Sequence, residues 1–450
     1  MDKPSLPSGT RDFAPAVMAR RRYITGTIER IYRLHGFAQL ETPAMENLSV
    51  LLGKYGDEGD KLVFRILNSG DFLSDVPEAQ RANPEAKTLL PFVAAKGLRY
   101  DLTVPFARFV AMNRHQLQFP FRRYQIQPVW RADRPQKGRY REFWQCDADV
   151  IGTRSLMAEA DLLLIMHEAF TSLGLPDYRI RVSNRLILEA IAEHAGRPEL
   201  FRAMVVAIDK WDKIGADGVK RELELAGFSE EQTLSVLNCM QQQTLSYDAL
   251  DALAGILSAY PKAQLGIDAL RTVLGSGLQA NLVLDTTLAR GLDYYTGCIF
   301  EAEIPNSGFG SVASGGRYDD LTGVFGVKDL SGVGISFGID RLYDVLETRA
   351  AFPAGLDIST ELLLCPMDES CMSSCFQMAM ELRRLGVSAE VYPDPAKLRK
   401  QLDHANQRNI PYAVIVGSEE MSSGVFPLKH LSQGSQEMLS LQDLYSRFRS

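Results

Sequence analysis

The chain has 450 residues, enough for two or three domains that each bury a core of their own. Its hydrophobic fraction of 46% and charged fraction of 23% are those of an ordinary globular protein. The formal charge of -7 excludes general coating of nucleic acid but permits a local basic site. No apolar run approaches the ~18 residues that span a bilayer, and the first residues lack the apolar centre of a secretory signal. Six scattered cysteines without a metal-ligand pattern predict a reducing compartment, so we expect a cytoplasmic protein without a membrane segment or a zinc site.

The first hundred residues predict a helix, short strands and one loop. Apolar spacing predicts a helix over 17–34 that ends at Gly36, followed by a strand over 37–43. Another strand is expected at 63–66. The polar, proline-containing segment 68–87 is typical of a mobile surface loop.

Residues 121–149 predict a long antiparallel hairpin, because two runs of period two flank a charged centre that contains glycine. Only Asp133 and Glu142 oppose its seven basic residues, which are Arg122, Arg123, Arg131, Arg134, Lys137, Arg139 and Arg141. A solvated charged face is one interpretation. In an acidic chain, a local cationic hairpin favours a second interpretation, the binding of a polyanion.

The middle of the chain changes character twice. A helix is expected over 157–173 and a strand over 178–182, and then strand patterns vanish until about residue 280. This stretch predicts an inserted helical domain. Strands are expected again at 281–287 and 297–304.

Glycines mark the next segment, where residues 308–318 contain five of them. A turn-rich linker is one explanation, and close approach of the backbone to a ligand is the other. A small-residue strand at 332–338 runs into a helix at 339–347 with Arg341 in its first turn. A cation there opposes the helix dipole, which suggests a functional role. Beyond a break near 352–359, strands alternate with helices and predict an α/β unit with a parallel sheet.

The familiar phosphate-binding patterns are absent from the sequence. There is no GxxxxGK[ST] loop, no GxGxxG between a strand and a helix, and no HxGH. A bound nucleotide must therefore be held by arginines on an antiparallel sheet, where guanidinium forks suit phosphate oxygens.

Several separated segments together resemble the histidyl-tRNA synthetase family of class II aminoacyl-tRNA synthetases. HGFAQLETP resembles the first class II motif, which ends at Pro43, and residues 121–152 resemble the second. GVGISFGIDRL resembles the third motif. RGLDYYTG (290–297) and SGGRYDDL (314–321) resemble the two histidine-specific signatures.

The resemblance implies an α+β fold, with a class II antiparallel sheet as catalytic core, a helical insertion and a C-terminal α/β anticodon-binding domain. The implied boundaries are a catalytic core over 1–185 and 281–355, an insertion over 186–280 and an anticodon-binding domain over 360–450. It also implies a homodimer.

The activity implied by the resemblance is histidine–tRNA ligation. L-Histidine and ATP form histidyl adenylate and pyrophosphate, and the histidyl group then passes to the 3′ end of tRNA(His) with release of AMP. Fixed cations would stabilise the charge that grows on the α-phosphate. The resemblance assigns ATP and catalytic roles to Arg131, Arg139, Phe143, Arg290 and Arg341. Arg131 contacts the α-phosphate, Arg139 and Arg341 hold the β- and γ-phosphates, and Phe143 stacks on adenine. Arg290 contacts the α-phosphate and the substrate carboxylate. Mg²⁺ accompanies ATP, and no protein ligand is assigned to it.

Histidine selection requires partners for one donor and one acceptor of a neutral imidazole. By resemblance, Asp149 and Tyr295 face the imidazole and Tyr318 lies nearby. The ammonium group is assigned to Asp101, Thr103 and Gln145. Asp101 and Asp149 stand where many relatives carry glutamate, and YDLT around Asp101 resembles the eukaryotic-type version.

The resemblance also implies contacts with tRNA. The hairpin tip with Arg134, Gln136 and Lys137 is expected to meet the acceptor end, and binding is expected to weaken with salt. Arg122 and Arg123 receive no role and are interpreted as surface charge.

Two alternatives stay open at this point. One is a non-catalytic paralogue that regulates the ATP phosphoribosyltransferase of histidine biosynthesis, and the other is a class II synthetase for another amino acid. Residues 360–450 and the intact histidine signatures argue against the paralogue, and the histidine signatures argue against a synthetase for another amino acid.

Overall fold

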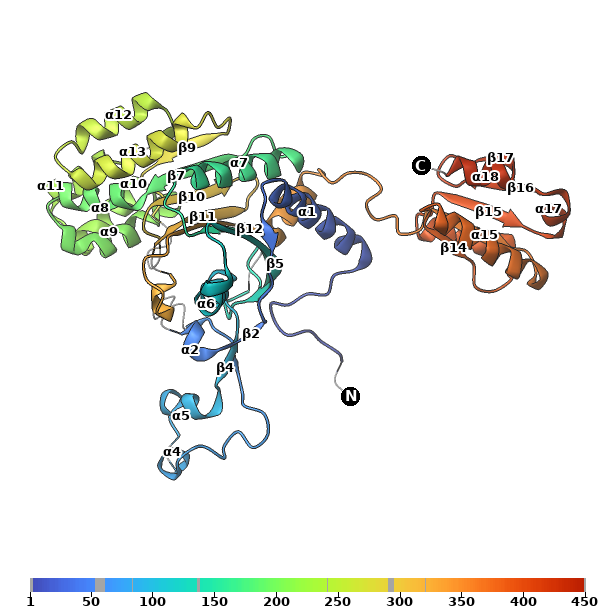
Figure 1. Ribbon diagram of the computed structural model, residues 1–450, viewed down its shortest axis with the longest axis horizontal. Coiled ribbons are helices and arrows are strands. Elements are labelled where there is room, and N and C mark those ends of the chain that lie inside the picture. The colour runs from blue at the N-terminus through green and yellow to red at the C-terminus, as the bar shows by residue number, and fades with distance from the viewer. Residues whose placement is uncertain are drawn as a thin grey trace. The chain divides into compact units, whose positions relative to one another are not determined.

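The computed structural model describes residues 3–52, 61–82, 84–135, 138–240, 242–289, 295–319 and 321–448 (Figure 1). The chain divides into two compact units. The larger unit combines Met1–Phe13 with Arg21–Phe352, and the smaller combines Ala14–Arg20 with Pro353–Ser450. Within the described ranges, no helix is long and apolar enough to cross a membrane.

The larger unit is built on a nine-stranded sheet with the order β1-β5-β6-β12-β11-β10-β7-β9-β8. Only the β1–β5 and β7–β9 pairs are parallel among these neighbours. The strands are β1 (Ala38–Gln39), β5 (Phe121–Trp130), β6 (Glu142–Ile151), β7 (Arg179–Asn184), β8 (Gln242–Thr244), β9 (Leu282–Asp285), β10 (Cys298–Glu303), β11 (Ala313–Tyr318) and β12 (Gly332–Gly338). The antiparallel core expected from the sequence is confirmed.

The hairpin predicted at 121–149 is the pair β5–β6, whose register runs from Phe121 opposite Ile151 to Trp130 opposite Glu142. Period-two alternation sends neighbouring side chains of each strand to opposite faces of the sheet. Consequently Cys146 and Ala148 share one face, and Asp147 and Asp149 share the other.

One face of the sheet is covered by two helices, α1 (Pro15–Leu34) and α7 (Met157–Ser172) (Figure 1). Tyr32 of α1 donates a hydrogen bond to the Cys146 carbonyl at 2.8 Å, and Phe170 of α7 packs edge-on against Phe337 of β12. Burial of these aromatic side chains makes this face the hydrophobic core of the unit. The other face carries polar side chains.

Helices gather at the β7 end of the sheet (Figure 1). They follow β7 in the chain and precede β9, and they are α8 (Arg185–His194), α9 (Phe201–Ile208), α10 (Trp211–Leu225), α11 (Glu230–Asn238), α12 (Tyr247–Ile256) and α13 (Pro261–Gly275). The expected helical insertion is thus present. The expectation that this stretch holds no strand was wrong, because β8 pairs with β9. Its three exposed residues show no alternation that a sequence pattern could reveal.

A small three-stranded sheet precedes the hairpin and consists of β2 (Met45–Asn47), β3 (Arg65–Ile66) and β4 (Lys96–Leu98). The loop expected over 68–87 contains the short helix α4 (Glu78–Ala82) and the start of α5 (Ala86–Val93), so the loop prediction was wrong there. Helix α4 buries none of its residues, and its polar sequence gave no helical stripe to detect. The larger unit also contains the helices α2 (Leu48–Leu51), α6 (Thr103–Asn113) and α14 (Ile339–Thr348).

The smaller unit contains a five-stranded sheet with the order β14-β13-β15-β16-β17. Its strands are β13 (Leu362–Pro366), β14 (Ala389–Val391), β15 (Tyr412–Val416), β16 (Val425–His430) and β17 (Ser435–Ser440). Its helices are α15 (Met372–Arg384), α16 (Leu398–Gln407), α17 (Ser418–Ser423) and α18 (Leu441–Arg447). The α/β character is confirmed, but a purely parallel sheet was wrong, because β16 and β17 add an antiparallel edge.

Candidate active site

A pocket of about 210 Å³ opens on the polar face of the nine-stranded sheet. Its walls come from β6, β11 and β12, the start of α6 with the segment before it, Arg131 just after β5, and Tyr295 near the end of the segment 290–297. Twelve residues line it, namely Asp101, Thr103, Arg131, Gln145, Asp147, Asp149, Tyr295, Ser314, Tyr318, Gly334, Ile335 and Ser336. Seven of the residues assigned from sequence therefore meet in one cavity.

Strand β6 supplies the floor through Gln145, Asp147 and Asp149, which follow one another at a spacing of two. The β5 partners of these residues are Gln127, Gln125 and Arg123, and the β12 partners are Gly338, Ser336 and Gly334. The floor therefore combines carboxylates, amides, a hydroxyl and a guanidinium from three adjacent strands.

Asp149 is held from two sides. The Tyr318 hydroxyl donates to its Oδ1 at 2.6 Å, and the Arg123 guanidinium lies 2.7 Å from its Oδ2. Burial raises the pKa of Asp149, and the charge of Arg123 opposes that shift. Arg123 is 0% exposed and lies over the Phe106 ring, so its interpretation as surface charge was wrong. Arg122, by contrast, is partly exposed and pairs with Asp161.

Glycines make room for these side chains. A Cβ on Gly334 would lie 2.1 Å from Asp149 Oδ1, and one on Gly332 would lie 2.3 Å from the Tyr318 ring. A Cβ on Gly316 would lie 2.8 Å from the Tyr295 ring. Gly315 and Gly316 lie within β11, so the linker interpretation is wrong for them, and at Gly316 close packing around the pocket explains the glycine.

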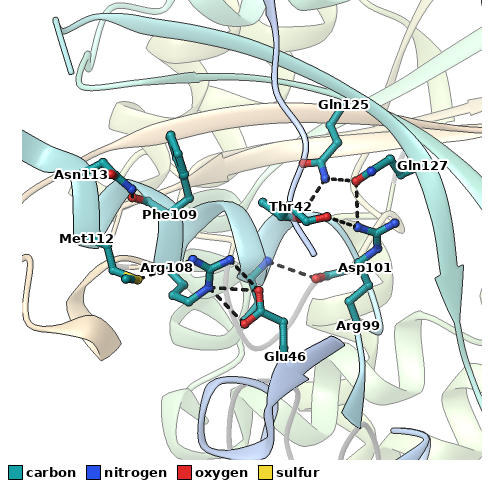
Figure 2. Close-up of polar contacts among 11 residues, drawn as sticks. Thr42, Glu46, Arg99, Asp101, Arg108, Phe109, Met112, Asn113, Gln125 and Gln127 are labelled. Carbon is teal, nitrogen blue, oxygen red and sulfur yellow. Dashed lines mark hydrogen bonds and ion pairs between the residues drawn. The ribbon is translucent and has the colours of Figure 1, made fainter. Parts of the chain in front are cut away.

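Asp101 lies at the start of α6, where its Oδ1 accepts the backbone N–H of Val104 at 3.1 Å. Nearby, the buried Arg99 donates to the Thr42 carbonyl and to Gln127 Oε1, as Figure 2 shows. Burial lowers the pKa of Arg99 to about 10. This network fixes the strand that leads to Asp101.

Asp147 was missed by the sequence reasoning, although it lines the pocket between Gln145 and Asp149. Its residue is 2% exposed, and its Oδ1 has no hydrogen-bond partner among the described residues. Burial raises its pKa to about 7, while Arg123 lowers and Asp149 raises that value. The alternation of polar residues along β6 was a signal that could have found it. Ser314 and Ser336 were missed as well.

Arginines assigned to ATP lie along the hairpin and beside its tip. Arg131 donates from Nε to the Tyr100 carbonyl at 3.2 Å, and its guanidinium lies 4.2 Å from the Tyr100 ring centre and 5.1 Å from that of Phe143. Arg341 donates to the Ser311 carbonyl at 2.6 Å and to that of Gly138 at 3.4 Å.

The remaining assigned residues lie outside the pocket or outside the part of the chain that the structure describes. Arg139 has a 52% exposed side chain 3.8 Å from Asp133, and Arg134 is exposed. Gln136, Lys137 and Arg290 lie outside the described residues. In the part of the chain that the structure describes, no three histidine, cysteine, aspartate or glutamate side chains form a metal-binding group.

The arrangement suits a small ligand with both cationic and hydrogen-bonding groups. Buried carboxylates at the floor favour an ammonium group or an N–H donor, whereas Arg131 at the rim favours a carboxylate or a phosphate. Such a pocket can bring an amino acid and a nucleotide phosphate together.

Comparison with known proteins agrees with this chemistry. A family model for histidyl-tRNA synthetase matches residues 94–342, and one for an anticodon binding domain matches residues 361–450. The histidine–tRNA ligase of Cytophaga hutchinsonii is 50% identical over 449 residues, 99% of each chain. That of Porphyromonas gingivalis is 48% identical, over 98% of this chain and 97% of the relative. The crystal structure of histidyl-tRNA synthetase from Nostoc sp. PCC 7120 matches with a TM-score of 0.84 at 29% identity, covering 100% of this chain and 99% of that one. The chain belongs to the histidyl-tRNA synthetase family.

Proposed function

We propose that the pocket on the polar face of the nine-stranded sheet is where this chain activates histidine. The chain is a histidine–tRNA ligase, an aminoacyl-tRNA ligase. It converts L-histidine and ATP to histidyl adenylate and pyrophosphate, and then transfers the histidyl group to the 3′ end of tRNA(His) with release of AMP. The observation that carries the site assignment is the buried Asp149, held by Arg123 and Tyr318 at the floor of the pocket.

In this proposal, Asp149 and Tyr295 recognise the imidazole of histidine through hydrogen bonds. A carboxylate accepts the imidazole N–H, and a tyrosine hydroxyl donates to the other ring nitrogen. The short Asp149 side chain is fixed by Arg123 and Tyr318, so it needs no further movement to present its oxygens. A side chain without both imidazole groups would leave buried partners unpaired, which disfavours it by roughly 10⁴-fold or more.

Asp101, Thr103 and Gln145 take the ammonium group of histidine, which places the substrate carboxylate toward Arg131. Arg131 and Arg290 then stabilise the negative charge that grows on the α-phosphate as the carboxylate attacks it. Phe143 stacks on adenine, and Arg139 and Arg341 hold the β- and γ-phosphates. Mg²⁺ enters with ATP, and we assign it no protein ligand.

Contacts with tRNA follow the division of the chain. We propose a catalytic core over 1–185 and 281–355, an insertion over 186–280 that clasps the acceptor stem, and an anticodon-binding domain over 360–450. Arg134, Gln136 and Lys137 at the hairpin tip meet the acceptor end. Salt weakens these phosphate contacts.

We also propose a homodimer that works in the cytoplasm. All six cysteines are free and buried, which suits a reducing compartment. The homodimer rests on the resemblance of residues 35–43 to the first class II motif.

The two rival functions are not favoured. A structure called an ATP phosphoribosyltransferase regulatory subunit/histidyl-tRNA synthetase, from Bacillus halodurans, matches at 19% identity and shows the fold alone. The match of residues 361–450 to an anticodon binding domain and the full-length likeness to histidine–tRNA ligases support the catalytic reading.

ATP–pyrophosphate exchange tests the proposed function. We expect exchange with L-histidine alone among histidine, threonine and proline. Arg290→Ala is expected to lose most of the exchange rate while the protein stays folded. No exchange with histidine, or exchange with another amino acid, would remove the proposal.

A further inference from the structure

Two acceptors on the pocket floor are unused in the described part of the chain. One is Oδ1 of Asp147 and the other is Oε1 of Gln145, and both atoms are buried. Their side chains point the same way, because the residues lie two apart on β6. Gln145 donates from Nε2 to Ser336 Oγ at 2.9 Å, which leaves its carbonyl oxygen available for a ligand.

A buried carboxylate with an unused oxygen is costly in the absence of a ligand, because desolvation disfavours its charge. Arg123 is the cation that acts most strongly on Asp147, but it is ion-paired with Asp149 at 2.7 Å. Three carboxylates, Asp101, Asp147 and Asp149, line the pocket together with one arginine, Arg131. The carboxylates therefore still outnumber the cations when the buried Arg123 is added. A cationic group on the ligand would restore that balance.

Asp101 cannot meet this need alone. One of its oxygens already accepts the N–H of Val104 at the start of α6. Asp147 approaches the same cavity from the sheet, opposite that helix start. The two carboxylates therefore converge on the pocket from different elements.

We propose that Asp147 is a further histidine-binding residue that accepts the α-ammonium group together with Asp101 and Gln145. The inference rests on the proposed function and deepens it by naming a binding residue outside the assigned set. The ammonium group offers three N–H donors. Beside the assigned Asp101 and Thr103, Gln145 Oε1 and Asp147 Oδ1 are buried acceptors that have no partner among the described residues. Binding then supplies the missing partner of Asp147 Oδ1.

Several charged and titratable groups interact with Asp147. Arg123, Asp149 and Asp101 act on it most directly from the pocket face, and Ser336 donates a hydrogen bond to it. The charge of Asp147 also affects the pKa values of Arg99, Tyr32 and Cys146. Burial raises the pKa of Asp147 to about 7, so an arriving ammonium group favours the ionised carboxylate.

The test compares two ligands on the wild-type enzyme and on Asp147→Asn. L-Histidine has the ammonium group, and 3-(imidazol-4-yl)propionate lacks it. We expect Asp147→Asn to weaken the binding of histidine by about 10-fold to 100-fold, as for the loss of a hydrogen bond to a charged group. Binding of the propionate, measured as inhibition of histidine-dependent exchange, should change by about twofold at most. The loss should appear in the KM for histidine and not in the KM for ATP.

Matched controls separate the outcomes. Asp161→Asn removes a carboxylate that pairs with Arg122, away from the pocket, and should leave the KM for histidine unchanged. An equal loss for both ligands, or no loss for histidine, would overturn the role of Asp147. Unfolding of both Asp147→Asn and Asp147→Ser would overturn it too, by showing a structural residue. An inactive wild-type enzyme would instead remove the proposed function.

Discussion

The two faces of the nine-stranded sheet treat buried charge in opposite ways. On the helix-covered face, Arg317 of β11 donates to both oxygens of Glu159 at 2.5 and 2.6 Å and to Ser331 Oγ at 2.6 Å. Glu159 is 0% exposed, and both of its carboxylate oxygens accept hydrogen bonds from the Arg317 guanidinium. On the pocket face, Asp147 keeps an oxygen without a partner in the described ranges.

The difference separates a charge that holds the fold from one that awaits a ligand. A buried ion pair whose hydrogen bonds are all made has no free donor or acceptor for a ligand. A buried carboxylate with an unpaired oxygen is stabilised when a cationic ligand group enters the pocket. Both groups are equally buried, so burial alone does not identify the site. Unmet hydrogen-bonding capacity inside a cavity does, because Asp147 Oδ1 and Gln145 Oε1 both line the pocket and lack a partner among the described residues.

The strongest way to break the helix-covered face is Arg317→Met. It leaves Glu159 buried without its partner, so the free energy of unfolding should fall by about 3–5 kcal/mol in urea denaturation. The double variant Glu159→Leu/Arg317→Met removes both charges and should recover most of that loss. A single variant within 1 kcal/mol of wild type by the same measurement, as for an exposed pair, would contradict this account.

Among substitutions on the pocket face, Arg131→Ala is expected to cause the largest loss of catalytic activity. It removes a cation aimed at the charge of the transition state, so kcat for ATP–pyrophosphate exchange should fall by roughly 10²–10³-fold. The folded protein should persist, since Arg131 makes one backbone hydrogen bond and stacks on two rings. Arg134→Ala serves as a control on an exposed arginine of the same hairpin. Equal exchange rates in the two variants would contradict the assignment.

Gly334→Ala should have a smaller and more selective effect. The added Cβ would lie 2.1 Å from Asp149 Oδ1, so Asp149 must shift away from its place against the imidazole. We expect the KM for histidine to rise by about 10-fold, near 1.4 kcal/mol, while the KM for ATP is retained. Gly255→Ala in α12, where the backbone is helical and nothing lies within 4 Å of the added Cβ, is the control for adding a methyl group. Equal KM values in wild type and Gly334→Ala would contradict the close packing.

A pH-dependent change in stability is expected at Asp147 on the pocket face. Burial raises the pKa of this carboxyl from 3.8 in the unfolded chain to about 7 in the folded one. The folded state therefore holds the proton more tightly, and this contribution to stability is full below 3.8 and lost as the pH rises through about 7. Asp147→Asn cannot ionise, so without histidine its unfolding temperature should exceed that of wild type by more at pH 8 than at pH 5. A gap that is constant with pH would argue against the raised pKa.

Much of the fold could be predicted because period-two alternation and helical stripes are local. The β5–β6 hairpin, α1, α7 and the insertion were visible in this way. The strand β8 escaped because three exposed residues carry no alternation, and the antiparallel edge of the smaller sheet escaped because β16 contains Pro427 and β17 is mostly polar. Pairing direction is set by partners far along the chain.

The site was predicted only in part for a similar reason. The spacing of Gln145 and Asp149 and the motif arginines were readable in the sequence, and seven assigned residues do line one pocket. Arg123 was interpreted as surface charge because one strand does not reveal which face another element covers. Its burial depends on Phe106 of α6 and on Asp149 across the β5–β6 pair. Recognising Asp147 as a pocket residue likewise required knowing which face of β6 forms the pocket.

A crystal structure of the enzyme with L-histidine tests the central claim most directly. We predict that the imidazole nitrogen lies about 2.7–3.2 Å from an Asp149 carboxylate oxygen, and that the ammonium group lies within the same range of Asp101, Gln145 and Asp147. Histidine bound in the reverse orientation, with its ammonium group at Asp149, or bound outside this pocket, would contradict it.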